Sequence, residues 1–383
     1  MSGRGRVCFH APYLYPLFSH AAIEFAGGAE VQQSLLARGL ARAGFEVSAV
    51  TCDYGQAPDL TDDGVRLLKT YPPQGGIPVL RFLHPRLSRT LGALLRADAE
   101  VYYARGLAVP AGESLEVARW KRAAFVLGTA HDHDARRDLP LHRSLRDRWW
   151  AGRALRGADA IVAQTEFQRD LYRNEFGRDS EVIPNLIEVP AAAVDAGRPG
   201  ALVWLATYRR SKRPEWFLEL ARRVPGQRFI MRGVLPAPPD REQAWEDARA
   251  AARACPNLEV RGFVDHERLS ALFTQAALFV HTSPAEGFPN TLLEAWAHGL
   301  PCIAAVDPDG VIGREGLGEV VGSFESLEDA VRRWLADPAL RRAAGARARA
   351  YVLARHAPEV VLERFGELLD RMVDRARARR ARG

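Results

Sequence analysis

Short apolar runs alternate with amphipathic stretches along most of the chain, and this alternation restricts the possible folds more than any other feature of the sequence. The runs are rich in Val, Ile and Phe, as strands buried on both faces are. Between them, apolar residues recur at helical spacing, as Leu36 and Leu40 do within 29–43. This order predicts an α/β fold with helices on both faces of a parallel sheet. The expected strands are 7–11, 46–51, 125–129, 160–163, 201–205, 228–232, 258–261, 277–281 and 302–305. The expected helices are 29–43, 215–223, 267–275, 291–298, 326–336 and 360–380.

The length of 383 residues suggests two such domains, since one domain typically takes about 100–200 residues. The alternation is interrupted by "VIPN" at 182–185, and the segment 189–200 is rich in Pro, Gly and Ala. We therefore expect an N-terminal domain over 1–185 and a C-terminal domain over 186–356. The C-terminal helix 357–383 is expected to join the N-terminal domain, and its end, "RARARRARG", to be a frayed basic tail.

Composition excludes several classes of protein. No apolar run reaches the roughly 20 residues that a membrane-spanning helix needs, and residues 7–9 are too short for a signal-peptide core. We therefore expect a cytoplasmic protein. The four cysteines lie far apart without CxxC spacing, which indicates neither a zinc site nor a disulfide framework. The formal net charge is +6, but no RNA-binding motif or zinc finger accompanies it, so no nucleic-acid partner is expected.

The most informative segment is "HTSPAEGFPNTLLEAWAHGLPCIA" at 281–304. A buried strand is expected to end at His281, and Asn290 stands where a helix N-cap belongs. The helix should close at Gly299. Ligands of parallel sheets bind outside the carboxyl ends of the strands, and helix starts attract anions. The segment therefore predicts a diphosphate site beside Asn290 and Thr291.

Two carboxylates in this segment, Glu286 and Glu294, can face one ligand from different directions. Glu286 lies in the loop, and Glu294 is expected in the first turn of the helix. Glu294 has two acceptor oxygens that suit the two hydroxyls of a ribose. Glu286 can accept hydrogen bonds from sugar hydroxyls or stabilise positive charge at an anomeric carbon. Taken alone, the pair is equally well explained as two carboxylates stabilised by the positive end of the helix dipole.

The complete string resembles a known family. "EGFPNTLLEAWAHGLP" is similar to the E-x7-E signature of the family 4 retaining glycosyltransferases. "GFVDHERLSALFTQAALFVHTS", "WLATYRRSKRPEWFLELA" and "FAGGAEVQQSLLARGLARAGFEVSAVT" resemble other segments of that family. The resemblance implies the GT-B fold, with two Rossmann-like doubly wound domains that face a central cleft. It also implies metal-independent transfer of a hexosyl group, with retention, from a nucleotide-diphosphate sugar to a hydroxyl. The form of the motifs resembles members associated with bacterial surface polysaccharides and glycolipids.

The resemblance implies roles for the loop that precedes the predicted helix. Glu286 would contact the donor sugar near the reacting carbon. Backbone amides of Gly287, Phe288 and Asn290 would hold sugar hydroxyls. Pro289 stands among them but has no N–H group to donate.

The resemblance also implies how the nucleotide is held. Asn290 and Thr291 would meet the diphosphate, Glu294 would bind the ribose, and Lys212 would neutralise phosphate charge. No cofactor is expected, and the nucleotide sugar, such as a UDP- or GDP-hexose, is the substrate.

One segment departs from the family pattern. Where Gly-Arg commonly stands in the phosphate loop, this chain has Ala206 and Thr207, so the usual arginine is missing. In extended backbone Arg209 points to the same side as Thr207. We expect Arg209 to take over the missing contact, with Arg210 as second choice. The alternative is that both arginines face solvent and Thr207 contributes only a hydroxyl.

Residues of the N-terminal domain are also implied in donor binding. Gly27 and Gly28 would let the backbone approach the phosphates closely. "HDHD" begins at His131 and follows a predicted strand, so His131 would reach the donor sugar. The alternatives are a strand-end histidine bonded to backbone, or a metal site, although the string lacks the further ligands that a metal site needs.

The acceptor is the least constrained partner. Trp149 and Trp150 stand among arginines in a helical stretch, which suits either an anionic membrane surface and a lipid-linked acceptor or ordinary core packing. Two alternative functions also remain open. One is a sugar phosphorylase or synthase on the same fold, and the other is a sugar-nucleotide-binding protein without turnover.

Overall fold

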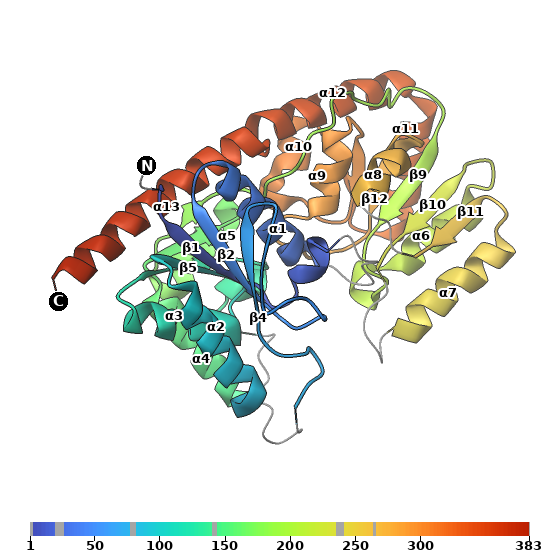
Figure 1. Cartoon of the computed structure of the whole chain (residues 1–383). Coiled ribbons are helices and arrows are strands. Elements are labelled where there is room, and N and C mark those ends of the chain that lie inside the picture. The colour runs from blue at the N-terminus through green and yellow to red at the C-terminus, as the bar shows by residue number, and fades with distance from the viewer. Residues whose placement is uncertain are drawn as a thin grey trace. The chain divides into compact units, whose positions relative to one another are not determined.

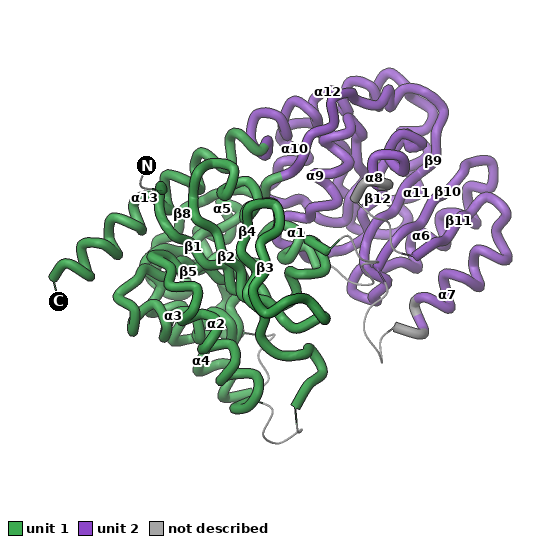
Figure 2. Tube along the Cα trace, in the orientation of Figure 1, with its two compact units in different colours: residues 1–22, 26–186, 358–383 green, residues 23–25, 187–357 purple. Residues whose placement is uncertain are grey.

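The structure is a computed structural model that describes residues 3–19, 27–76, 82–139, 144–234, 241–262 and 266–382, without the side chains of 241, 242, 244 and 266–268. The chain divides into two compact units (Figure 2). Unit 1 runs to Leu186 and takes up the chain again from Pro358, and unit 2 covers Ile187–Ala357. In the part of the chain that is described, no helix has the length and hydropathy to cross a bilayer.

Unit 1 is a doubly wound sheet with the strand order β3-β4-β2-β1-β5-β6-β7-β8. Figure 1 labels β4, β2, β1 and β5 of this sheet. Every pairing is parallel except that of the edge strand β3. From β4 to β7 the order runs 3-2-1-4-5-6, so it reverses between β1 and β5. The strands are β1 (Arg6–His10), β2 (Glu46–Thr51), β3 (Asp59–Asp62), β4 (Val65–Lys69), β5 (Val101–Arg105), β6 (Ala124–Gly128), β7 (Ala160–Ala163) and β8 (Glu181–Val182).

Helices cover both faces of this sheet, as the alternation predicts. The apolar stripe of α1 and that of α13 bury Leu36, Leu40, Phe365 and Leu368 in one core. A second core lies under α2, α3 and α4. The helices of unit 1 are α1 (Gly28–Arg42), α2 (Ser88–Ala97), α3 (Val109–Trp120), α4 (Leu145–Gly157), α5 (Glu166–Phe176) and α13 (Pro358–Ala381).

Unit 2 is a fully parallel sheet with the order β11-β10-β9-β12-β13-β14. This is again 3-2-1-4-5-6, and the order reverses between β9 and β12. The strands are β9 (Ala201–Leu205), β10 (Phe229–Arg232), β11 (Leu258–Arg261), β12 (Ala276–His281), β13 (Cys302–Ala304) and β14 (Gly318–Val320). The helices are α6 (Pro214–Arg223), α7 (Arg241–Ala254), α8 (His266–Phe273), α9 (Asn290–Ala297), α10 (Val311–Glu315), α11 (Phe324–Ala336) and α12 (Pro338–Arg355).

The prediction of a frayed C-terminal tail is wrong. Helix α13 continues to Ala381, and its arginines are paired. Arg377 donates to Glu100 at 2.8 Å, and Arg379 donates to Asp159 at 2.5 and 2.9 Å. Both carboxylates are buried at the amino ends of strands, where each needs a cationic partner. The basic end of the helix is therefore part of the folded unit.

Candidate active site

The first cluster of predicted site residues lies at the switch point of unit 2. Strands β9 and β12 are neighbours in the sheet. After β9 the chain continues towards β10 on one side of this pair, and after β12 it continues towards β13 on the other side. The loop after β9 carries Lys212, and the loop after β12 carries Glu286. A crevice at this position is where open α/β sheets bind their ligands.

The structure brings Lys212 and Glu286 into direct contact. The Lys212 ammonium donates a hydrogen bond to Glu286 Oε1, and His281 Nε2 lies 3.8 Å from the same oxygen. Burial favours the neutral form of Glu286, but the charge of Lys212, together with His281 and Ser283, holds its pKa below the usual value. Glu286 is therefore an ionised carboxylate beside a fixed cation.

A buried hydrogen-bond chain fixes the position of Lys212. Lys212 ends the 3₁₀ helix η4 (Arg210–Lys212), and its carbonyl accepts from the hydroxyl of Thr282. That hydroxyl in turn accepts from the indole N–H of Trp204 at 2.9 Å. The sequence reasoning assigned no role to Trp204 or Thr282, although both lie within the segments that it singled out.

His281 is also placed at this site, and sequence reasoning had used it only as a strand end. It is the last residue of β12 and is 4% exposed. Burial lowers its pKa to about 4, against the attraction of Glu286. Its Nδ1 has no hydrogen-bond partner among the described residues. His281 is thus a neutral imidazole held against Glu286.

Helix α9 begins one residue earlier than the motif predicts. Its N-cap is Pro289, and Asn290 is the first helical residue, so Asn290 is not the N-cap. Glu294 accordingly lies in the second turn rather than the first, and it is 7% exposed. The predicted C-terminus is correct. Gly299 has a φ of +80°, and the Leu300 N–H donates to the Ala295 carbonyl at 3.0 Å in a Schellman motif.

The loop before α9 is anchored by Phe288. Its side chain is buried, with its ring 6.1 Å from Trp296 and 5.1 Å from His356. Gly287 and Pro289 are buried on either side of it. Phe288 therefore supports the loop through the packing of its side chain.

Thr207 and Arg209 do not lie in the extended backbone that the sequence prediction assumed. The Arg209 N–H donates to the Thr207 carbonyl at 2.7 Å, so the chain turns tightly around Tyr208. Because this stretch is not extended, the alternation of side chains does not apply. Arg209 and Arg210 are exposed, whereas Tyr208 is buried.

The remaining predicted residues belong to unit 1. Gly27 is the N-cap of α1 and Gly28 its first residue. A Cβ atom at Gly27 would require the Glu30 carboxylate, the end of a flexible side chain, to move. Burial raises the pKa of Glu30, although contacts with backbone N–H groups oppose this.

His131 and the rest of "HDHD" form a local cap. His131 is the N-cap of the 3₁₀ helix η3 (Asp132–Ala135), and its Nδ1 accepts from the His133 N–H at 3.3 Å. Asp134 accepts from the N–H groups of Ala130 and His131 at 2.8 and 3.1 Å. Within the described residues, no three His, Cys, Asp or Glu side chains are grouped as metal ligands.

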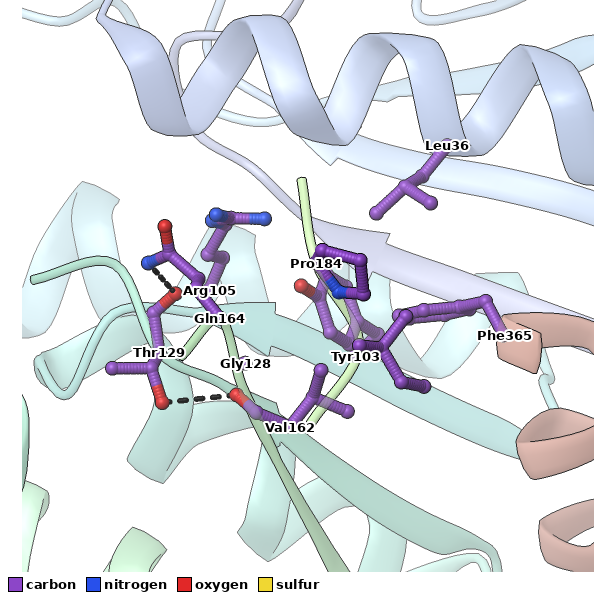
Figure 3. Close-up of a pocket in the computed structure, with 10 residues that line it drawn as sticks. Leu36, Tyr103, Arg105, Gly128, Thr129, Val162, Gln164, Pro184 and Phe365 are labelled. Carbon is purple, nitrogen blue, oxygen red and sulfur yellow. Dashed lines mark hydrogen bonds between the residues drawn. The ribbon is translucent and has the colours of Figure 1, made fainter. Parts of the chain in front are cut away.

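Arg105 is a polar residue of unit 1 that sequence reasoning missed. It ends β5, beside the switch point of that sheet, and Figure 3 shows it lining a small cavity with Thr129 and Gln164. Its guanidinium donates to Asn185 at 2.6 Å. Asn185 donates to Gln164 at 3.1 Å, and Gln164 donates to the Thr129 carbonyl at 2.8 Å. The network holds the end of the predicted hinge string against β6 and β7.

Two family models match consecutive parts of the chain. The Glycosyl transferase 4-like domain matches residues 27–185, and Glycosyl transferases group 1 matches residues 199–337. The chain belongs to glycosyltransferase family 4. It is therefore an enzyme of glycosyl transfer. Both strands of the unit 2 switch point, β9 and β12, lie within the second matched region, and β5 of the unit 1 switch point lies within the first.

Two curated relatives share part of this glycosyltransferase. The GtfA subunit of the UDP-N-acetylglucosamine–peptide N-acetylglucosaminyltransferase of Streptococcus pneumoniae is 23% identical over 40% of this chain and 31% of its own length. An exopolysaccharide phosphotransferase of Streptomyces coelicolor is 26% identical over 57% of this chain and 24% of its own length. The aligned regions thus span less than a third of either relative.

Solved structures show the fold. Sucrose-phosphate synthase from Thermosynechococcus elongatus has a TM-score of 0.75 at 19% identity and covers 96% of this chain and 98% of its own. HepE from Anabaena, in complex with UDP-glucose, has a TM-score of 0.71 at 16% identity and covers 95% and 99%. The glycosyltransferase therefore has the GT-B architecture of two Rossmann-like units.

Proposed function

We propose that this glycosyltransferase moves a hexosyl group, with retention and without a metal ion, from a UDP- or GDP-hexose to an acceptor hydroxyl. We propose further that the acceptor is lipid-linked and that the reaction serves bacterial surface polysaccharide or glycoconjugate synthesis at the cytoplasmic side of a membrane. The UDP-glucose complex of HepE supports a nucleotide-sugar donor. The exopolysaccharide relative supports the assignment to surface glycans.

The contact between Lys212 and Glu286 at the switch point is the observation that carries this proposal. Transfer of a sugar leaves negative charge on the departing diphosphate and positive charge near the anomeric carbon. A lysine ammonium meets the first, and a carboxylate that stays ionised at neutral pH meets the second. Preorganised charges of this kind lower a barrier by roughly 3–4 kcal/mol for each group.

The start of α9 supplies the second part of the proposed phosphate site. The positive end of its dipole lies beside Asn290 and Thr291, next to the loop that holds Glu286. Glu294 follows on the same helix and is proposed to accept from the ribose hydroxyls. Lys212 and this helix start together would offset the diphosphate charge, which is the role that a metal ion has in other transferases.

Nucleotide binding tests the ribose assignment. In Glu294→Ala, we expect the Kd for UDP or GDP, whichever binds the wild type, to rise about tenfold or more, as the loss of a charged hydrogen bond implies. The 2′-deoxynucleotide should already bind the wild type weakly. Calorimetric titration measures both. Glu315→Ala, which removes an exposed carboxylate paired with Arg314, is the matched control. Unchanged affinity in Glu294→Ala would refute the assignment.

A further inference from the structure

Unit 1 contains an open pocket of 630 Å³ whose polar lining is almost entirely arginine. The ends of α3, α4 and α13 form it, and we call it the arginine pocket. Its charged residues are Arg119, Arg122, Arg156, Arg375, Arg379 and Arg382, with Asp159 as the one carboxylate among the lining residues. Six guanidinium groups thus converge on a single small surface.

Asp159 cannot balance this charge. Its side chain is 8% exposed and already accepts from Arg375 at 3.1 Å, from Arg379 at 2.5 Å and from the Phe125 N–H at 3.0 Å. In the described part of the chain, no carboxylate pairs with Arg122, Arg156 or Arg382. Like charges held together in this way raise the free energy of the folded state unless an anion joins them.

The arginine pocket lies away from the candidate active site of its own sheet. Ala123 and Phe125 stand at the start of β6, and Ala158 and Asp159 precede β7. These are the amino ends of parallel strands, whereas ligands of such sheets bind at the carboxyl ends. The pocket therefore has no part in donor binding, and its charge calls for another partner.

Exposed aromatic and apolar side chains accompany the arginines. Trp120, between the pocket residues Arg119 and Arg122, is 75% exposed. Helix α4 packs against α3 and ends at the pocket. On this helix Trp149 is 53% exposed, and Leu145, at the opposite end from the pocket, is 87% exposed. Isolated exposed tryptophans beside basic residues are typical of a bilayer interface, where the ring enters the headgroup layer.

This arrangement changes the surface that the sequence predicted. Of the two adjacent tryptophans, Trp150 packs against α3, where a Cβ atom at Gly112 would collide with its ring. Only Trp149 faces solvent, with Arg153 over its ring at 5.0 Å. The sequence did not point to Trp120 or to the arginine pocket.

We propose that the arginine pocket, with Trp120 and Trp149, docks unit 1 onto an anionic phospholipid bilayer, with lipid phosphates bound among the arginines. One guanidinium group can donate two parallel hydrogen bonds to two oxygens of a phosphate, which suits arginine to phospholipid headgroups. Helix α4 connects the parallel strands β6 and β7, so it runs from the carboxyl edge of the sheet to its amino edge. Docking along the length of α4 therefore leaves the carboxyl edge of the sheet next to the bilayer. The proposal specifies the membrane contact of the proposed function but requires no catalysis.

Vesicle co-sedimentation of the full chain tests this docking surface. We expect binding to phosphatidylcholine vesicles that contain phosphatidylglycerol, weak binding to pure phosphatidylcholine, and a decrease as salt rises. The triple variant Arg122→Ala, Arg156→Ala, Arg382→Ala removes three arginines without a carboxylate partner, so it should fold. Its affinity for anionic vesicles should fall roughly a hundredfold, as expected for three basic residues near a charged surface.

The matched control has the same change in net charge on unit 2. Arg198, Arg253 and Arg355 are exposed, and Arg198→Ala, Arg253→Ala, Arg355→Ala should bind anionic vesicles like the wild type. Equal losses in both triple variants, or equal binding to neutral vesicles, would overturn the proposal. So would stabilisation by inorganic triphosphate through the pocket arginines without vesicle binding, since that result assigns the pocket to a soluble anion. The release of nucleoside diphosphate from the donor is measured in parallel without vesicles. This second assay tests the proposed reaction independently of membrane docking.

Discussion

At the scale of single residues, two charges far apart in the sequence meet at one point of the fold. Lys212 and Glu286 come from different loops, and the sequence assigned them to the same ligand only through the family resemblance. Their direct contact followed from no pattern in the sequence. The supporting residues His281, Thr282 and Trp204 followed from no sequence pattern either. His281 becomes buried and neutral, and Lys212 gains its hydrogen-bonded support, only when β9 and β12 pair.

The phosphate loop supplies the first prediction at this scale. We propose that Arg209 replaces the arginine missing at Thr207, since it is exposed in the loop that holds Lys212. Lys212→Ala should lower kcat/KM about a hundredfold, and Arg209→Ala should lower it comparably. Arg210→Ala, at an equally exposed neighbour, tests the second choice for this contact. Steady-state kinetics of the three variants decide the matter, and near-wild-type kinetics in Arg209→Ala would reject the replacement.

The second residue-scale prediction concerns His281 and pH. The pKa of His281 is about 4 in the folded protein against 6.5 in the unfolded chain. The unfolded state therefore binds the extra proton first, and stability falls as pH falls from 6.5 to 4. At pH 5 this difference in pKa lowers the free energy of unfolding by about 2 kcal/mol.

The His281→Gln variant lacks this titrating group. Urea unfolding at pH 7 and pH 5 should therefore show a smaller loss of stability in the variant than in the wild type. Parallel pH dependence in the two proteins would show that His281 does not carry the effect.

At the scale of elements, the periodic spacing of apolar residues predicted those helices and strands whose bounds depend on nearby residues. Helix α9 and the expected strands, among them β1, β6, β9 and β12, lie within a residue or two of the expected bounds, because apolar spacing and the glycine at position 299 act locally. Five strands were not predicted: β3, β4, β5, β8 and β14. The short polar sequence "DLTD" of the edge strand β3 carries no strand pattern. The end of α13 was misjudged because its partners, Glu100 and Asp159, lie far away in the sequence.

Truncation of α13 tests its folded end. Removal of residues 375–383 leaves Glu100 and Asp159 buried without their arginines. We expect the free energy of unfolding of unit 1, measured in urea, to fall by roughly 2–3 kcal/mol. This is less than the loss expected on breaking a fully buried ion pair, because the arginines are partly exposed. Adding Glu100→Gln and Asp159→Asn should restore part of the loss. A truncated chain as stable as the full chain would indicate a frayed tail after all.

At the scale of the whole molecule, each unit repeats the 3-2-1-4-5-6 strand order, and each places its predicted site residues near a reversal of that order. Alternation along the chain predicted parallel sheets, but strand order is a property of crossovers and could not be derived from the pattern alone. The family resemblance implied two doubly wound domains, and the solved structures that share the fold confirm this architecture. Nothing in the sequence pattern predicted the arginine pocket, because its residues come from three helices.

Release of nucleoside diphosphate from a panel of nucleotide sugars, in the presence of EDTA, tests the central claim most directly. The wild type should release UDP or GDP from one hexose donor, and Glu286→Ala and Lys212→Ala should each be slower by about a hundredfold. Addition of magnesium or manganese should leave the wild-type rate unchanged. Tight nucleotide binding without release from any donor, or activity that requires the added metal, would contradict the account.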